Sequence, residues 1–452
     1  MKKAKLLIGT LVVLAAAWVL TPIIHSMRHL CPVRPTGVAE AEAITAWARK
    51  YGVSCTVCHT TGYKLTGAGQ KFLRGGHKMP GNVEMKDARL TDYLAVTGKL
   101  RSTAKYSKVA EQEKADVIKT GNGFQAHAFS IYTGGPLDKG FSYFGEMYLH
   151  ENEATSESPT KLADEQNSLE GNWARSKLAE MYLQYHHYFN DDAFVSARMG
   201  RIMSSLVHLH GGGARLEYSR PVPFMSTLGD NPYRTYNRQY GWALGSGYKD
   251  FFLELGIVNG TGKNENAVEL DTDHHKDVFT TLDYSFDSNG SMIGAYFYKG
   301  YYPLHWLAKA QGGDRFYQYG LLGNYTFKPG PVGGALVGSL LWGNNRFTPT
   351  AETQEKNHHS LTYYVEAQAH FKDGDIAPYV KWEYFDKDTA LPDNEKFGPA
   401  FGVHYKPFDH GRFVLEYSRY LTRGNTLPAN PTAGKKKDTI NQDLTLELQF
   451  MF

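Results

Sequence analysis

The chain has 452 residues, a formal net charge of +3 and 13% aromatic residues. This charge balance gives no sign of a nucleic-acid partner, and the mean hydropathy of −0.44 excludes a bundle of apolar transmembrane helices. The 30 Tyr, 24 Phe and 46 Gly instead favour a β-rich protein with aromatic girdles.

Residues 1–43 have the character of a signal peptide followed by a linker. Three lysines within the first five residues precede an apolar run from Leu6 to Leu20, which is typical of a secretion signal. An uncleaved inner-membrane anchor is the alternative. Cys31 follows in a context that does not resemble a lipoprotein site, and we interpret it as an incidental thiol.

Residues 44–91, called the N-terminal segment below, contain the pentad Cys55-Thr56-Val57-Cys58-His59. This is the attachment pattern of a c-type haem, in which each thiol bonds a haem vinyl group and the histidine ligates the iron. A disulfide or half of a zinc site is the alternative, but Cys31 is the only other cysteine, too few for a second zinc ligand pair. We expect one covalent haem c held by Cys55, Cys58 and His59.

Several side chains are candidates for the sixth ligand of the haem iron. Met79 and His77 are the local candidates; methionine raises the haem potential, and a second histidine usually leaves it lower. Met85 is a weaker candidate. A histidine from the following strands is a further alternative, and the candidates there are His127, His150 and His186.

The N-terminal segment is expected to be a small helical unit. Helical periodicity covers Ile44–Tyr51, and a second helix is expected over Thr66–Arg74, ended by Gly75-Gly76. A unit of this size makes a poor core by itself. We therefore expect it to need both the covalent haem and a wall to pack against.

From Asp92 to Phe452 the sequence alternates between apolar and polar residues in runs separated by turn signals. In the last run Thr445, Glu447 and Gln449 fall on the face opposite the apolar residues, as in a strand with one lipid face and one wet face. Sixteen such runs begin near residues 92, 122, 140, 174, 192, 236, 250, 275, 290, 315, 332, 359, 375, 396, 411 and 439. We predict a mostly β fold: residues 92–452 form a transmembrane antiparallel β-barrel of about 16 strands, preceded by the small α-helical haem segment. A soluble propeller is the alternative, but no blade repeat is present.

Short and long connections alternate between the runs. Tight turns occur at joints such as Asp287-Ser288-Asn289-Gly290 and Lys372-Asp373-Gly374. Longer loops lie near 152–173, 204–235, 260–274, 303–314, 346–358, 388–395 and 423–438. Outer-membrane barrels have short periplasmic turns and long external loops. The long loops are therefore expected outside, and an even strand count places the N-terminal segment on the periplasmic side.

The charge distribution suggests how the N-terminal segment is held. Between Ile44 and Leu90 eight basic residues stand against two acids. The predicted lumen faces carry Glu146, Glu180, Glu366, Glu383, Glu416 and Glu447. We expect a basic plug in an acidic lumen; the alternative is that both sets of charges are solvated.

One CxxCH pentad followed by such a barrel resembles the fused outer-membrane monohaem cytochrome–porin family, whose best-known members are iron oxidases. The resemblance rests on the stretch Ala48–His59 and on Leu65, Gly69 and Phe72. It covers the layout of the whole mature chain, but its motif is confined to the haem region. Downstream of the pentad, Tyr63 and Thr66-Gly67-Ala68 depart from the family pattern.

The resemblance implies an outer-membrane electron conduit. It would accept electrons from an extracellular donor, Fe(II) in the first place, through the haem and pass them to a periplasmic c-type cytochrome. Such a redox protein is of the Fe(II):cytochrome c oxidoreductase type and needs no catalytic side chains of its own. The alternatives are a transport porin with a haem-bearing structural or gating plug, and a conduit that exports electrons outward.

Overall fold

The computed structural model describes residues 45–61, 64–79, 89–111, 115–151, 177–213, 215–229, 231–260, 275–303, 313–327, 332–346, 357–408, 410–424 and 437–451. The predicted signal and linker, and the candidate ligand Met85, lie outside these residues.

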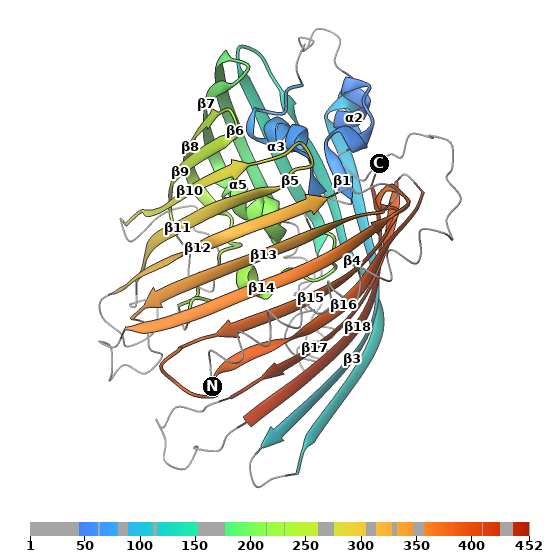
Figure 1. Ribbon diagram of the computed structural model, residues 1–452, viewed down its shortest axis with the longest axis vertical. Coiled ribbons are helices and arrows are strands. Elements are labelled where there is room, and N and C mark those ends of the chain that lie inside the picture. The colour runs from blue at the N-terminus through green and yellow to red at the C-terminus, as the bar shows by residue number, and fades with distance from the viewer. Residues whose placement is uncertain are drawn as a thin grey trace.

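Sixteen strands form a closed barrel in which each strand pairs with its neighbours in the chain and β18 closes the sheet against β3 (Figure 1). The strands are β3 (Leu94–Glu111), β4 (Val117–Pro136), β5 (Phe141–Glu151), β6 (Lys177–Asn190), β7 (Ala193–Ile202), β8 (Gln239–Tyr248), β9 (Phe251–Val258), β10 (Asp277–Ser285), β11 (Met292–Pro303), β12 (Gly313–Phe327), β13 (Val332–Asn345), β14 (His358–Phe371), β15 (Ile376–Asp386), β16 (Glu395–Phe408), β17 (Gly411–Thr422) and β18 (Lys437–Met451). All sixteen pairings are antiparallel. Each strand begins within five residues of its predicted start, so the sixteen-strand barrel is confirmed.

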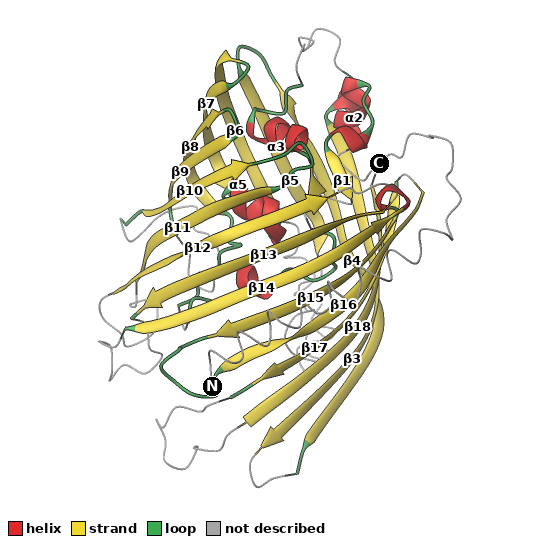
Figure 2. Ribbon diagram, viewed as in Figure 1, coloured by secondary structure: helices red, strands yellow, loops and turns green. Residues whose placement is uncertain are grey.

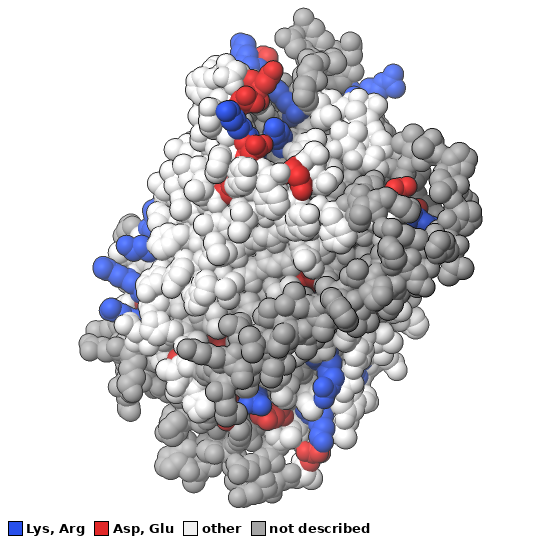
Figure 3. Space-filling model, in the orientation of Figure 1, with Lys and Arg blue, Asp and Glu red and all other residues white. Residues whose placement is uncertain are grey.

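The strands place apolar side chains outside and polar side chains inside. In β18, Leu446 is 42% exposed, whereas its neighbour Glu447 is 1% exposed. In β6 the same alternation exposes Met181 and Leu183 and buries Gln184. Figure 3 shows that charged side chains gather towards the two ends of the barrel, with a mainly uncharged surface between them. This arrangement inverts that of a soluble protein and suits a wall that faces lipid.

The N-terminal segment lies in one mouth of the barrel, at the end that carries the short turns (Figures 1 and 2). Its elements are α2 (Thr45–Tyr51), the 3-10 turn η2 (Cys55–Val57), a hairpin of β1 (His59–Thr61) and β2 (Lys64–Leu65), α3 (Gly67–Arg74) and η4 (Leu90–Asp92). The hairpin was not expected, because strands of three and two residues are too short to show alternation. One turn of the barrel, η9 (Lys372–Gly374), lies against β1. Among the described residues, none of the helices has the length and apolarity needed to span a membrane.

The connection between β7 and β8, residues 203–238, folds into the barrel and is called the lumen loop below. It contains α5 (Ser205–Val207), the π-helical turn η6 (His208–Gly212) and α6 (Val222–Met225). Leu206, Phe224 and Tyr233 are at most 1% exposed and pack against inward-facing residues of the barrel wall. The expectation of an external loop near 204–235 is therefore wrong. The physical reason is that this loop carries large apolar side chains, whose burial removes them from water.

Candidate haem site

The CxxCH pentad lies in a turn that is held by the start of α3. Thr66 donates from its amide to the Cys58 carbonyl oxygen at 2.9 Å and from its hydroxyl to the Val57 carbonyl oxygen at 2.7 Å. Helix α3 then packs directly on the pentad, because a Cβ at Gly69 would lie 2.2 Å from the Cys58 carbonyl oxygen. Only glycine permits this approach. The backbone of the pentad at Val57 and Cys58 is thus fixed against the start of α3.

Cys58, His59 and Met79 line one cavity of about 210 Å³ that extends from the N-terminal segment into the barrel lumen. Aromatic and aliphatic side chains form its wall around the pentad; they include Trp47, Tyr51, Leu65, Phe72 and Leu73. The Cys58 thiol is partly buried and free, and burial raises its pKa. The side chain of Cys55 lies outside the described set.

The structure separates the candidates for the sixth ligand. Among those that lie in the described residues, Met79 lines the cavity with His59, whereas His77 and the three barrel histidines are not in its lining. His127 and His186 are buried, and the ring of His150 lies 3.0 Å from the carbonyl oxygen of Ala126. Of the described candidates for the sixth ligand, Met79 therefore lies in the same cavity as the pentad, and the four candidate histidines do not line it.

His77 has a different environment. Its ring stacks on Trp47 with centroids 4.5 Å apart and lies near Phe72 and Phe144. Burial, with Arg198 and His186 as smaller causes, lowers the pKa of His77 to about 3. Its ring is therefore a neutral part of an aromatic cluster that joins the N-terminal segment to β5.

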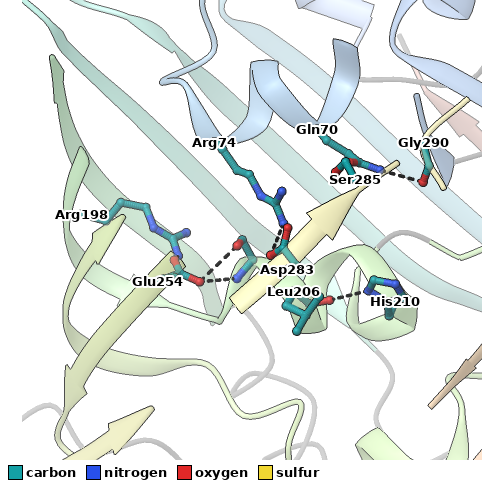
Figure 4. Close-up of polar contacts among 10 residues, drawn as sticks. Gln70, Arg74, Arg198, Leu206, His210, Glu254, Asp283, Ser285 and Gly290 are labelled. Atoms are coloured by element: carbon teal, nitrogen blue, oxygen red, sulfur yellow. Dashed lines mark hydrogen bonds and ion pairs between the residues drawn. The ribbon is translucent and has the colours of Figure 1, made fainter. Parts of the chain in front are cut away.

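Polar contacts from α3 fasten the N-terminal segment to the inside of the barrel wall (Figure 4). Arg74 Nη2 lies 2.8 Å from Asp283 Oδ2, with both side chains buried. Gln70 Nε2 donates to the Gly290 carbonyl oxygen at 2.9 Å, and the Ser285 hydroxyl donates to Gln70 Oε1 at 2.9 Å. These residues belong to β10 and to the turn that follows it, so the helix is docked at the short-turn end.

The six predicted lumen glutamates all lie inside the barrel and are at most 5% exposed, but their described ion pairs are with the barrel and the lumen loop. Arg238 pairs with Glu146 at 2.9 Å and with Glu180 at 3.3 Å. From the N-terminal segment, Lys64 approaches Glu366 and Glu217, although burial lowers the pKa of Lys64 to about 8. We expected basic residues of the N-terminal segment to pair with these glutamates. In the described residues, arginines of the barrel and the lumen loop form most of the pairs instead.

These residues fit a c-type haem. Cys58, His59 and Met79 line the same cavity, whose wall around the pentad is aromatic and aliphatic. A histidine with a methionine is a known pairing of iron ligands in cytochromes c. His59 and Met79 would hold the iron, and Cys55 and Cys58 the porphyrin edge. Among the described residues no group of three or more His, Cys, Asp and Glu side chains is arranged to hold a metal ion.

Sequence reasoning missed the far wall of the cavity. The lumen loop contributes Met203, His208, Arg215 and Arg220 to the lining. The available signal was composition: the loop carries several large apolar residues, which an external loop would expose to water.

Solved structures with similar folds are outer-membrane channels. An anion-selective porin from Comamonas acidovorans is 11% identical over 79% of this chain and 99% of the porin, with a TM-score of 0.50. The outer membrane channel DcaP of Acinetobacter baumannii is 10% identical over 79% of this chain and 97% of the channel, with a TM-score of 0.48. No family model and no curated protein matches the sequence. At these identities the likeness shows the porin fold alone.

Proposed function

We propose that this chain is an outer-membrane electron conduit with one covalent haem c. It accepts electrons from an extracellular donor, with Fe(II) as the first candidate, and delivers them to a periplasmic cytochrome. The observation that carries the proposal is the placement of Cys58, His59 and Met79 around one cavity in the mouth of the barrel. A haem attached there would supply a one-electron couple at the mouth of the barrel.

The chain's own residues create the setting for that chemistry. The aromatic side chains of Trp47, Tyr51 and Phe72 line the pentad side of the cavity, and α3 holds the N-terminal segment on the barrel wall through Arg74 and Gln70. The lumen loop folds into the barrel beyond the cavity and packs against inward-facing residues of the wall.

The apolar outer face supports the outer-membrane location, because its exposed side chains match a lipid-facing band. The N-terminal segment docks at the short-turn end, which is the periplasmic end in barrels of this type. The haem is therefore proposed to lie on the periplasmic side, within reach of a soluble cytochrome.

A transport channel with a haem-bearing plug is the second candidate. It is favoured by the porin fold and by the cationic side chains that line the cavity. Against it stands the lumen loop, whose backbone is tied to the wall at several points, such as the bond from the Val222 amide to Glu383 Oε1 at 2.6 Å.

One reconstitution separates the candidates. The full chain is inserted into liposomes that enclose an oxidised soluble cytochrome c, and Fe(II) is added outside. The conduit predicts reduction of the enclosed cytochrome, which is lost in a Cys55→Ala/Cys58→Ala variant, and no swelling of the liposomes in sugar solutions. Swelling in sugars, together with reduction of the enclosed cytochrome that persists in the Cys55→Ala/Cys58→Ala variant, would show that Fe(II) passes through an open channel and would refute the conduit. Liposomes that enclose reduced cytochrome and face an external Fe(III) chelate test outward flow.

A further inference from the structure

The cavity carries more positive charge than its carboxylates neutralise. Seven cationic side chains line it: Arg74, Lys99, Arg198, Arg215, Arg220, Arg238 and Arg412. Four of these have a carboxylate within 4 Å, namely Asp283, Glu254, Glu146 with Glu180, and Glu447. For Lys99, Arg215 and Arg220, the described residues offer no carboxylate at that distance.

Arg215 and Arg220 are neighbours on the lumen loop, and backbone carbonyls and one ring provide their described contacts. Arg215 donates to the Tyr218 carbonyl oxygen at 3.3 Å, and its buried Nε has no hydrogen-bond partner among the described residues. Arg220 donates to the Gly212 carbonyl oxygen at 3.1 Å and lies over the ring of Tyr236 at 4.0 Å. Burial, followed by repulsion from Arg220, lowers the pKa of Arg215 against the attraction of Glu217 and Glu447. Since partly buried unpaired charges are costly, the pair is suited to an anion.

The lumen loop holds both arginines in place through its backbone. Arg412 Nη1 donates to the Leu216 carbonyl oxygen at 3.2 Å, and the Ser219 hydroxyl donates to Glu416 Oε1 at 2.5 Å. These two anchors flank the stretch 216–219 between Arg215 and Arg220. The guanidinium groups are therefore presented to the cavity from a fixed loop, which favours a bound anion over a transient one.

We propose that Arg215 and Arg220 bind the two propionate carboxylates of the haem attached at the pentad. The inference rests on the proposed function, because it needs the haem. Two guanidinium groups on one side of the cavity match two carboxylates in number and sign, and guanidinium–carboxylate contacts can be bidentate. The lumen loop thus completes the site from the barrel side, so that neither the N-terminal segment nor the barrel binds the cofactor alone.

The test is an equilibrium redox titration of the purified full-length haem protein. Arg215→Gln and Arg220→Gln should each lower the equilibrium constant for reduction about tenfold, as expected for loss of one unit charge about 10 Å away at an effective dielectric constant of about 20. For one electron this is ~59 mV. Arg215→Lys and Arg220→Lys should restore most of the shift. Arg423→Gln, which removes an arginine paired with Asp393 near β17, should leave the potential unchanged.

Resonance Raman spectra provide a second readout, since the propionate bending bands should shift in both glutamine variants. If one glutamine variant fails to insert haem, the other variant and the lysine variants still decide the question. Haem-loaded glutamine variants with the wild-type potential and propionate bands would overturn the inference and leave the proposed function standing. If the potential of the wild-type protein changed with the concentration of phosphate, the two arginines would bind a dissolved anion and not the propionates, and the inference would be overturned. A wild-type chain that carries no haem would overturn both.

Discussion

Arg74 on α3 and Asp283 on β10 form a buried ion pair with 2.8 Å between Nη2 and Oδ2. The two residues are 209 positions apart in the chain, and their contact joins the N-terminal segment to the inner wall of the barrel. Removing one partner leaves the other charge buried without compensation. Mutation of this pair therefore tests whether the N-terminal segment and the barrel are held together as one unit.

Arg74→Met should weaken docking of the N-terminal segment by about 3–5 kcal/mol. The reason is the uncompensated Asp283 carboxylate, and the measurement is hydrogen exchange of α3 amides together with protease release of the segment. Arg74→Met/Asp283→Leu should recover most of the loss, because a buried pair can often be replaced by apolar residues. Lys71→Ala, at an exposed position of the same helix, is the matched control. Equal exchange in Arg74→Met and Lys71→Ala would show that the pair does not hold the segment.

Met79→His should lower the haem midpoint potential, because a second histidine usually gives a lower potential than methionine. His77→Gln should disturb the stack on Trp47 but leave the potential near that of the wild type, since His77 does not line the cavity. Redox titration of both haem proteins is the measurement. A large shift in His77→Gln with none in Met79→His would reverse the ligand assignment.

Leu446→Arg should destabilise the barrel in lipid by about 2–4 kcal/mol if the residue lies near the bilayer midplane. Leu446 is exposed on the outer face of β18, where the arginine charge would face hydrocarbon. Urea titration of the folded fraction in liposomes measures the change, and Leu446→Met serves as the size-matched control. An arginine variant as stable as the methionine variant would argue against a lipid-facing position.

Acidification should loosen the lumen loop through His210. Burial, with Lys64 and Arg74 nearby, lowers the pKa of His210 to about 4, although its Nδ1 lies 2.9 Å from the Leu206 carbonyl oxygen. An unfolded loop therefore takes up the proton first as the pH falls. The stabilisation is complete above the ordinary histidine pKa of about 6.5 and is lost progressively as the pH falls towards 4, by about 3 kcal/mol in all.

Hydrogen exchange of the lumen loop between pH 7 and pH 4.5 measures this effect. His210→Asn keeps a donor near the Nδ1 position and should weaken the dependence on pH, leaving the part that comes from His208, whose pKa is also lowered by burial to about 4. The exposed His187→Asn should retain the full dependence. Exchange that responds to pH equally in both variants would assign the effect to other groups.

The barrel was predictable because strand alternation is a local signal. In β18 the order Leu444, Thr445, Leu446, Glu447 already states which side chain faces lipid and which faces the lumen. The CxxCH pentad is an equally local signal, and the haem that it indicates stays a prediction. Both features depend on residues within a few positions of each other.

The path of the lumen loop and the lining of the cavity were not predictable, because they depend on contacts between distant residues. Tyr233 reaches Tyr296, with their hydroxyl oxygens 2.5 Å apart, and Arg238 reaches Glu146. No periodicity in the sequence encodes such contacts. The same limit applies to Met79 and His77, which are two positions apart in the sequence. Met79 lines the cavity, whereas His77 stacks on Trp47.

The proposed conduit is tested most directly by the anaerobic absorbance spectrum of the purified full-length protein before and after addition of Fe(II). We expect a covalent haem c spectrum that changes to the reduced form within seconds and that is lost in a Cys55→Ala/Cys58→Ala variant. A haem protein that stays oxidised under Fe(II) at its working pH would contradict the assignment of Fe(II) as donor. A protein without covalent haem would contradict the electron conduit itself.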